Sequence, residues 1–354
     1  MVLGMGILSI ILFIVVLIII VIIFLPKIMQ IFQISKSILS NGSEPNLNFS
    51  TNTNSLANQT ISEGPLVNYT LSLINKDRNE NGFSNVSLSS EPSAQQHADS
   101  MLEYNYFSHW DIYGMKPYMR YTLLNGKGAV EENVAYTKSG VRACLGSICS
   151  TYGNLNVTAA IAQMEYNMVY NDSLCCNNGH RFNILDPYHN QVSIGIAYNS
   201  TTVYLVEDFV NNYIYWLNNT PSFNGNEVQL KGSIANNYVL SSIEVTYDPI
   251  VSNMSIEQLD QTHSYSYGNA IAGISSSPLN YYPNLTTIDA DNYYTSGSDF
   301  LVGFNMEKLI QQYGSGEYTI AIWLDNSSAN SSFIGSTYTI FINSNGNAYV
   351  PSNI

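Results

Sequence analysis

The sequence of 354 residues predicts an α+β protein in which a membrane anchor and a stalk precede a mixed helix and sheet domain and a β-sandwich. Three observations predict this class. An almost uninterrupted apolar run fills residues 7–25, helical periodicity gives way to strand alternation within residues 65–217, and short alternating runs separated by turn clusters fill residues 221–345. The chain is long enough for about two domains at roughly 150 residues each.

The apolar run predicts an uncleaved transmembrane anchor within residues 1–39. Its length is close to the roughly 20 residues that a helix needs to cross a bilayer. A cleavable secretory signal is the alternative, but no basic segment precedes the run and no small-x-small cleavage site follows it. Lys27 and Lys36 favour a cytoplasmic C-terminal side, yet large domains translocate with little regard to nearby charge. We therefore expect membrane-anchored globular domains outside the cell, or a secreted protein if the signal is cleaved.

Residues 40–64 are rich in Ser, Asn and Thr and predict a flexible stalk, because they hold too few apolar residues to form a core. The formal net charge is −14 although only 11% of the residues are charged, which argues against a nucleic-acid partner. Asn-x-Ser/Thr triplets recur along the chain and suggest a glycoprotein. An Asn-rich sequence with many such acceptor triplets suits a protein of an archaeal cell surface.

The four cysteines are Cys144, Cys149, Cys175 and Cys176, an even number that fits a disulfide framework in an extracellular protein. Three pairings exist. The adjacent Cys175 and Cys176 are most easily satisfied by two bridges to the loop of residues 144–149. A zinc site of four thiolates is the alternative, but the spacing lacks any Cys-x-x-Cys.

Helices are expected first in the mixed domain. Apolar residues from Leu66 to Ile74 predict a helix that ends in the turn of residues 79–82. Pro92 opens a second helix that ends before Phe107, and Asn156 caps a third that carries the apolar residues Ile161, Met164, Met168 and Val169. Alternation at residues 192–196 and 203–209 then predicts two strands, so the helices should pack on a sheet.

The C-terminal region predicts strands throughout. Short apolar runs occupy residues 228–230, 243–247, 270–272, 300–304, 318–323 and 338–342. This spacing is typical of a β-sandwich of immunoglobulin-like type. This part of the sequence has no cluster of His or Cys and no carboxylates at regular spacing. We therefore expect it to bind another molecule or to act as a spacer.

Three motifs in the mixed domain carry chemistry. They are Phe107-Ser108-His109-Trp110, Glu131-Glu132-Asn133-Val134-Ala135, and Gly179-His180-Arg181-Phe182-Asn183-Ile184-Leu185-Asp186-Pro187. Together they place two imidazoles and at least one carboxylate in one domain, the raw material of a metal site or an acid/base cleft.

In this order the motifs resemble the CAP superfamily, which comprises the cysteine-rich secretory, antigen 5 and pathogenesis-related 1 proteins and the SCP-like domains of prokaryotes. The resemblance runs from about residue 66 to about residue 215. It implies an α/β/α core with a cleft of two histidines and two glutamates, where some members bind a divalent metal. The resemblance places these residues at His109, Glu132 and His180. The fourth is Glu165, with Asp172 as the substitute, because the aromatic residue usual before that glutamate is missing.

The resemblance leaves several functions open. His109 and His180 can supply nitrogen ligands to zinc or another divalent cation, with Glu132 and Glu165 as catalytic carboxylates. Without metal, a carboxylate beside an imidazole forms an acid/base pair, or the cluster only locks helices to loops. The expected protein is a surface module that binds a metal or a lipid, glycan or envelope-protein ligand. The alternatives are a metal-dependent, peptidase-like hydrolase acting on envelope components and a purely structural or adhesive module.

The remaining histidines and two arginines receive simpler interpretations. His97 lies on the second predicted helix and is expected to be a packed or surface residue. His189 and His263 are expected to be solvated. Arg120 and Arg181 are expected to pair structurally with carboxylates or carbonyls.

Overall fold

The computed structural model describes residues 63–139, 142–145, 148–151, 155–235, 238–276 and 285–351. The predicted anchor and nearly all of the predicted stalk lie outside these residues. Within the described part of the chain, none of the helices combines the length and the apolar character that a membrane span requires.

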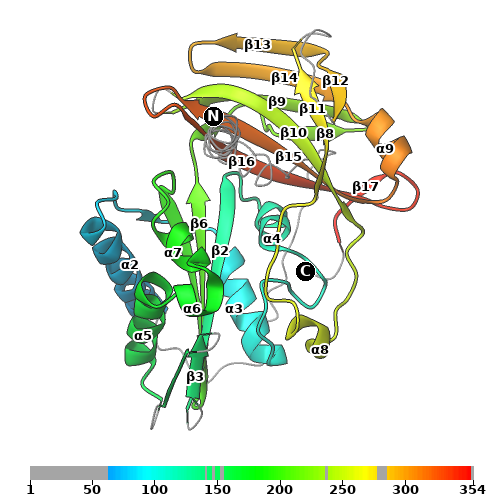
Figure 1. Cartoon of the computed structure of the whole chain (residues 1–354). Coiled ribbons are helices and arrows are strands. Elements are labelled where there is room, and N and C mark those ends of the chain that lie inside the picture. Colours follow the sequence, from blue (N-terminus) through cyan, green and yellow to red (C-terminus); the bar gives the residue numbers. More distant parts are fainter. Residues whose placement is uncertain are drawn as a thin grey trace, which may run out of the picture.

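The first domain has three layers built around a four-stranded sheet (Figure 1). The strand order is β1 (Ser87–Leu88), β5 (Gln191–Tyr198), β6 (Thr202–Asn211) and β2 (Ala129–Lys138). Helices α2 (Glu63–Glu80) and α5 (Val157–Tyr170) cover one face, and α3 (Ser93–Tyr104) covers the other. The predicted helices and the two predicted strands are therefore confirmed, and the domain is α+β.

The central strand β6 shows why both faces need helices. Val203 and Leu205 pack against α2 and α5, whereas Tyr204 and Val206 point to the opposite face and pack with Ala98 of α3. Every residue of β6 is buried. Because both faces of β6 are covered, even its carboxyl residues Glu207 and Asp208 are buried, in contrast to a strand with one face in water.

Short elements that periodicity does not reveal complete this domain. They are α4 (Pro117–Leu123), α6 (Ser173–Cys176), α7 (Gly179–Ile184) and the hairpin of β3 (Arg142–Leu145) and β4 (Ile148–Thr151). Arg78 of α2 positions α7: its buried guanidinium donates to the carbonyls of Ile184 at 2.6 Å and Asp186 at 3.0 Å. The helix that carries His180 is thus tied at its end to the first helix.

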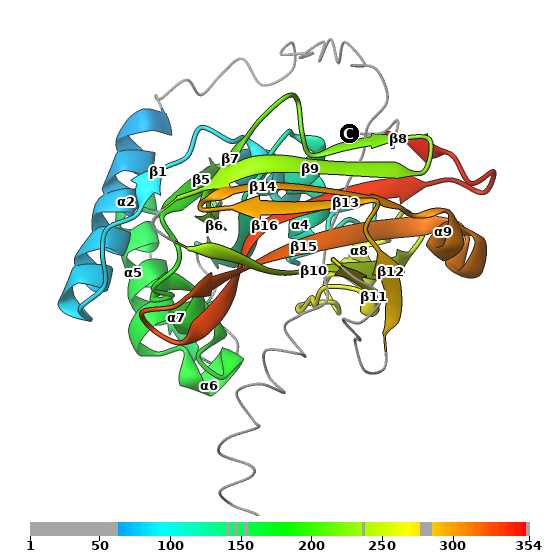
Figure 2. The same cartoon turned by 90° about the horizontal axis from the view of Figure 1, so that it is seen from above.

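The C-terminal region forms two sheets that face each other across one core (Figures 1 and 2). One sheet holds β7 (Ile214–Trp216), β8 (Ser222–Asn224), β9 (Glu227–Ile234), β13 (Asn292–Ser296) and β14 (Asp299–Asn305). The other holds β10 (Val239–Pro249), β11 (Asn269–Ser275), β12 (Thr286–Asp289), β15 (Gly316–Asn326), β16 (Ser331–Ile342) and β17 (Ala348–Tyr349). Helix α9 (Glu307–Tyr313) joins β14 to β15. Each strand predicted in this region is found.

The segment between β10 and β11 leaves the sandwich and runs back over the first domain (Figure 1). We call residues 250–268 the strap; it contains α8 (Ile256–Leu259). Leu259 is buried in the cluster on the α3 face, and the Met254 N–H donates to the Ile112 carbonyl at 2.9 Å. The two regions are therefore joined by packed side chains and hydrogen bonds as well as by the chain itself.

A buried ion pair anchors this junction. The Lys116 ammonium, just before α4, lies 2.7 Å from Oδ1 of Asp248 at the end of β10. It also donates to the carbonyl of Ser266 in the strap at 2.8 Å, and the Tyr118 hydroxyl donates to Oδ2 of Asp248 at 2.6 Å. Removing one partner of such a pair leaves a buried charge without compensation, so these contacts fix the strap firmly.

Candidate functional site

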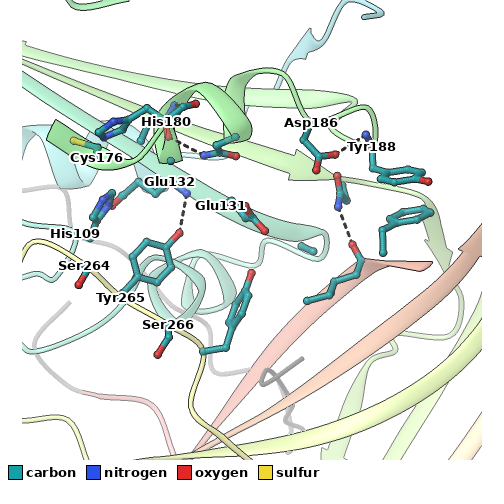
Figure 3. A pocket seen from close by; sticks show the side chains of 18 of the residues that line it. His109, Glu131, Glu132, Cys176, His180, Asp186, Tyr188, Ser264, Tyr265 and Ser266 are labelled. Atoms are coloured by element: carbon teal, nitrogen blue, oxygen red, sulfur yellow. Dashed lines mark hydrogen bonds and ion pairs between the residues drawn. The ribbon is translucent and has the colours of Figure 1, made fainter. Parts of the chain in front are cut away.

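A cavity of about 750 Å³ lies where the first domain, the strap and the sandwich meet (Figure 3). The first domain contributes the three predicted residues His109, Glu132 and His180. The strap adds Tyr265 and Tyr267, and the sandwich adds an apolar wall of Trp323, Phe333 and Ile334. Sequence reasoning placed the site within one domain, whereas the structure builds its walls from both.

His109 is held by Glu132 of strand β2. Nδ1 of His109 lies 2.9 Å from Oε1 of Glu132. The other carboxylate oxygen, Oε2, accepts from Arg120 Nη2 at 2.6 Å and lies 2.8 Å from Nδ1 of His97. Burial alone would raise the pKa of Glu132, but His97 and Arg120 lower it below its ordinary value. Glu132 is therefore an ionised carboxylate with both oxygens engaged, which suits positioning of His109 better than the expected role of a base.

His180 is held by a different carboxylate. Nδ1 of His180 lies 2.7 Å from Oδ1 of Asp172, a buried residue between α5 and α6. Oδ2 of Asp172 accepts from the backbone N–H of Arg181 at 3.2 Å. Asp172, which the sequence offered as the substitute for Glu165, is thus the carboxylate that contacts His180.

Glu165 does not line the cavity but lies in the core behind it. It faces Glu207 of β6, and burial together with the Glu207 charge raises the pKa of Glu165 well above its ordinary value. The Asn133 amide lies 3.5 Å from Oε2 of Glu207 and accepts at its own oxygen from Asn183 at 2.9 Å. Glu165 and Glu207 therefore act as a buried carboxyl pair that supports Asn133, and Glu165 reaches no ligand directly.

The side chains of the adjacent residues Glu132 and Asn133 point to opposite faces of β2. Successive side chains of a strand alternate, so Glu132 points toward α3 and His97 while Asn133 points toward α7. Because β2 is the edge strand of its sheet, the cavity reaches around that edge and is lined by His109 and His180 together. Two adjacent polar residues in the second motif therefore support the site from the two faces of one strand.

The strap completes the site on its open side. The backbone N–H of Glu132 donates to the Tyr265 hydroxyl at 2.9 Å, and the Tyr265 ring lies 5.0 Å from the His109 ring (Figure 3). The Tyr267 hydroxyl donates to the Val130 carbonyl at 3.0 Å. Two tyrosine hydroxyls thus occupy backbone groups on the free edge of β2, where a strand from another molecule would otherwise pair. Their spacing in the sequence gave no signal of this contact.

The prediction for His189 was wrong, whereas those for His97, His263 and Arg120 are confirmed. His97 is buried against Glu132 and belongs to the support of the site, because α3 turns it toward β2. His189 is also buried, with its ring nitrogens 2.8 Å from Asn183 and Asn211, since the turn after α7 folds inward. Arg120 binds Glu132 and the carbonyls of His109 and Met115, as expected of a structural cation. His263 is exposed at the rim of the cavity.

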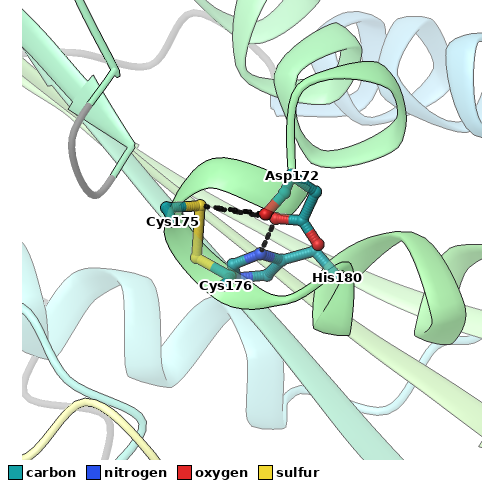
Figure 4. Close-up of side chains that lie close together, drawn as sticks. All are labelled: Asp172, Cys175, Cys176 and His180. Carbon is teal, nitrogen blue, oxygen red and sulfur yellow. Dashed lines mark hydrogen bonds and ion pairs between the residues drawn. A yellow bond between two sulfur atoms is a disulfide. The ribbon is translucent and has the colours of Figure 1, made fainter.

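The expected disulfide pairing is corrected. Cys175 and Cys176 are bonded to each other at the end of α6 (Figure 4). The backbone register of the β3–β4 hairpin places Cys144 opposite Cys149. Of the three possible pairings, the sequence reasoning favoured two bridges to the loop of residues 144–149, whereas the structure has the bond between neighbours, and both residues line the cavity.

The two cavity histidines have the chemistry that a divalent cation needs. In each ring Nδ1 contacts a carboxylate, so Nε2 is the nitrogen left for a ligand, as in carboxylate–histidine–metal arrangements. Burial lowers the pKa of His109 despite the opposing effect of Glu132, which favours the neutral, ligating imidazole. Among the described residues that line the cavity, none is Lys or Arg. These residues fit a divalent cation.

The three-layer domain with two histidines at the edge of its sheet corresponds to one known protein family. The family described as CAP, Cysteine-rich secretory protein family, matches residues 71–216. The chain therefore contains a CAP superfamily domain, as the motifs predicted. A comparison with curated protein sequences finds no match.

Solved structures with SCP or CAP domains are similar to this region. An extracellular protein containing an SCP domain from Bacillus anthracis is 17% identical, with a TM-score of 0.30, over 42% of this chain and 40% of that one. An outer surface protein from Borrelia burgdorferi is 12% identical, with a TM-score of 0.31, over 42% and 96%. The CAP domain of enterococcal PrgA is 15% identical, with a TM-score of 0.29, over 43% and 62%. The chain thus spans less than half of the Bacillus protein.

Proposed function

We propose that the protein is a membrane-anchored, extracytoplasmic surface protein whose cavity binds a divalent metal ion, such as zinc, or a small ligand through His109 and His180. One observation carries the proposal. Each imidazole is oriented by a buried carboxylate at Nδ1, Glu132 for His109 and Asp172 for His180, so Nε2 of each ring remains for a ligand in the cavity that both rings line.

The charge and shape of the cavity favour a cationic or metal-assisted ligand site. Glu131 is an exposed carboxylate on the wall, and the aromatic side chains of Tyr265 and Tyr267 offer flat apolar surfaces. A bound divalent cation would supply an electrophile that polarises a ligand oxygen. The residues of the chain would bind the cation, orient the ligand against the tyrosines and exclude anions.

The geometry favours binding over the hydrolase alternative. A hydrolase of this kind needs a carboxylate that is free to take a proton from water. Glu132 contacts His109, His97 and Arg120. Glu165 lies in the core away from the cavity wall. Neither of the two predicted catalytic carboxylates has the freedom that the hydrolase requires.

The surface location rests on two features. The apolar run of residues 7–25 has the composition of a membrane span, and the Cys175–Cys176 disulfide suits an oxidising compartment. If the anchor is uncleaved, the protein stays with the membrane pellet after carbonate washing. Release of the whole chain into the wash would argue for signal cleavage.

We also propose an immunoglobulin-like identity for the C-terminal sandwich. Strand β9 pairs β14, which pairs β13, while β15 lies between β10 and β16; this is the order of strands B, E, D and C, F, G in immunoglobulin domains. The Tyr318 hydroxyl donates to the Gly314 carbonyl at 2.6 Å near the start of β15, in the manner of a tyrosine corner. Tyr318→Phe should lower the free energy of unfolding by about 1–2 kcal/mol in urea denaturation. An unchanged stability would contradict the tyrosine-corner assignment.

The test of the cavity site is a zinc titration of the full-length chain in detergent. The wild type is compared with His109→Ala/His180→Ala, and His263→Ala serves as the matched control because His263 is an exposed histidine on the rim. We expect one equivalent of zinc in the wild type and the control, and a loss of binding in the double variant at similar melting temperature. Equal binding in all three proteins, or none in the wild type, would overturn the metal proposal.

A further inference from the structure

Four side chains capable of binding a metal converge at one end of the cavity (Figure 4). One ligand atom from each of Asp172, Cys175, Cys176 and His180 lies within 4.8 Å of the others. We propose that reduction of the Cys175–Cys176 disulfide converts this cluster into a zinc site with two thiolates, one imidazole and one carboxylate. The inference goes beyond the proposed function, because this site requires neither His109 nor a metal bound between the two cavity histidines.

The position of the disulfide is poorly explained by a stapling role. A disulfide stabilises a fold mainly by closing a loop of the unfolded chain, and its contribution grows with loop length. Cys175 and Cys176 are neighbours in the sequence, so their bond closes almost no loop. It does not join two elements either, since both residues belong to α6. The chemistry of the two sulfurs is therefore the better reason for their placement.

The carboxylate and the imidazole already lie within 4.8 Å of the sulfurs. Sγ of Cys175 lies 3.5 Å from Oδ1 of Asp172, and Nδ1 of His180 lies 2.7 Å from the same oxygen. Asp172 is buried and is further fixed by the backbone N–H of Arg181, whereas His180 and both cysteines are partly exposed at the cavity. The buried Asp172 thus holds the cluster together, and the three partly exposed residues leave it open to an incoming ion.

The donor set selects the type of metal. Thiolates, imidazoles and carboxylates are all zinc ligands, and the four donors here match the coordination number of four that zinc prefers. Thiolates favour zinc and softer ions over magnesium or calcium, which prefer oxygen. In the disulfide form the sulfurs are bonded to each other and cannot act as thiolates, so the site exists in the reduced protein alone.

The chemical step is a two-electron exchange with a dithiol. The dithiol is oxidised to its cyclic disulfide, and the Cys175–Cys176 bond is reduced to two thiols, which receive the two protons of the dithiol. Zinc then binds as the two thiols lose their protons to solvent. Oxidation of the same pair by a disulfide-bonded partner reverses the sequence and releases the ion. The cluster would therefore couple the redox state of its surroundings to metal content.

The test uses the full-length chain in detergent, reduced with a dithiol and desalted without oxygen, beside the untreated protein. Zinc affinity is measured by competition with a chromophoric chelator, and Co²⁺ is used in a parallel titration because thiolate coordination gives an intense charge-transfer absorption. The variant Cys175→Ser/Cys176→Ser removes the site. The matched variant Cys144→Ser/Cys149→Ser removes the other two cysteines, and His109→Ala isolates the site of the proposed function.

We expect the reduced wild type to bind one equivalent of zinc at least about 100-fold more tightly than the oxidised protein, with a thiolate–Co²⁺ absorption. Both signals should vanish in Cys175→Ser/Cys176→Ser and persist in Cys144→Ser/Cys149→Ser and in His109→Ala. Equal affinity before and after reduction, or signals that follow Cys144 and Cys149, would overturn the inference. Loss of zinc binding in oxidised His109→Ala would instead report on the proposed function, so the two ideas fail separately.

Discussion

Nδ1 of His180 lies 2.7 Å from Oδ1 of Asp172, and this contact repeats the one that fixes the other cavity histidine. In the second case Nδ1 of His109 lies 2.9 Å from Oε1 of Glu132. The two carboxylates come from unrelated elements, since Glu132 is on edge strand β2 and Asp172 immediately precedes α6. The fold therefore builds the same support for an imidazole twice, from two different elements.

The first prediction separates Asp172 from Glu165. Asp172→Asn removes the carboxylate that orients the His180 ring, so the zinc affinity of the oxidised protein should fall about 10- to 100-fold. Glu165→Gln should leave that affinity unchanged, because Glu165 lies in the core against Glu207. Isothermal titration with zinc measures both variants.

Both variants need a check on folding, for which circular dichroism and the melting temperature suffice. An intact Glu165→Gln protein that loses zinc, beside an Asp172→Asn protein that retains it, would reverse the assignment and return Glu165 to the site.

The second prediction concerns the stability that Glu132 provides. Glu132→Gln leaves the buried Arg120 guanidinium without its carboxylate and removes the charge beside His97. Breaking a buried ion pair on one side typically costs about 3–5 kcal/mol, and we expect a loss of that size in the free energy of unfolding. Urea denaturation followed by circular dichroism measures it.

Glu131→Gln is the matched control, because Glu131 is the exposed neighbour on the same strand. It should change the stability by less than about 0.5 kcal/mol. Equal stability of the two variants would show that the cluster around Glu132 is not an ionic network.

The site shows where sequence reasoning succeeds. The Phe-Ser-His, Glu-Asn and Gly-His-Arg motifs identified His109, Glu132 and His180, and the cavity contains all three. The pattern did not reveal that Asp172 in place of Glu165 contacts His180, or that His97 contacts Glu132, because both contacts depend on how α6 and α3 are turned toward the sheet. Contacts between segments distant in sequence leave no local periodicity to read.

The prediction of the fold from the sequence has the same limit. Long periodic helices and the strands of the sandwich follow from the apolar pattern, whereas short helices such as α7 are held by contacts from elsewhere, as Arg78 does through the Ile184 carbonyl. The apolar residues of the strap follow no helix or strand period over most of its length, and two of its contacts are made by tyrosine hydroxyls, so the sequence did not reveal it. It affects the site through the hydrogen bond between Tyr265 and the backbone of Glu132, a contact that forms only in the tertiary structure.

The third prediction tests the strap. Tyr265→Phe keeps the ring beside His109 but removes the hydroxyl that accepts from the Glu132 N–H. One lost hydrogen bond of this kind costs about 1 kcal/mol, and the freed amide of an edge strand should exchange faster with deuterium. Hydrogen exchange at the amide of Glu132 provides the local measurement.

Tyr294→Phe controls for the loss of a hydroxyl as such, because Tyr294 is exposed on β13, far along the chain from the strap. Unaltered protection at Glu132 in Tyr265→Phe would mean that the strap does not seal the edge of β2.

The fourth prediction is that the protein becomes less stable as the pH rises from about 5 to about 8.5. Burial raises the pKa of Glu244 and of Glu317 to about 8 and that of Glu91 to about 7. Between the ordinary pKa of a glutamate and these raised values, the unfolded chain has released its protons while the folded chain still holds them. Each such carboxyl therefore lowers the free energy of unfolding by up to about 1.4 kcal/mol per pH unit in that window.

Melting temperatures recorded across this range by circular dichroism measure the effect, and the Glu244→Gln/Glu317→Gln variant should show a flatter profile because an amide does not titrate. Glu257→Gln, at an exposed position in α8, should keep the wild-type slope. Glu132 acts in the opposite direction: since its pKa is lowered, the stability it provides is present above the ordinary glutamate pKa and is lost only in stronger acid. A melting temperature that rises between about pH 5 and pH 8.5 would show that the buried carboxyls are ionised in the folded protein.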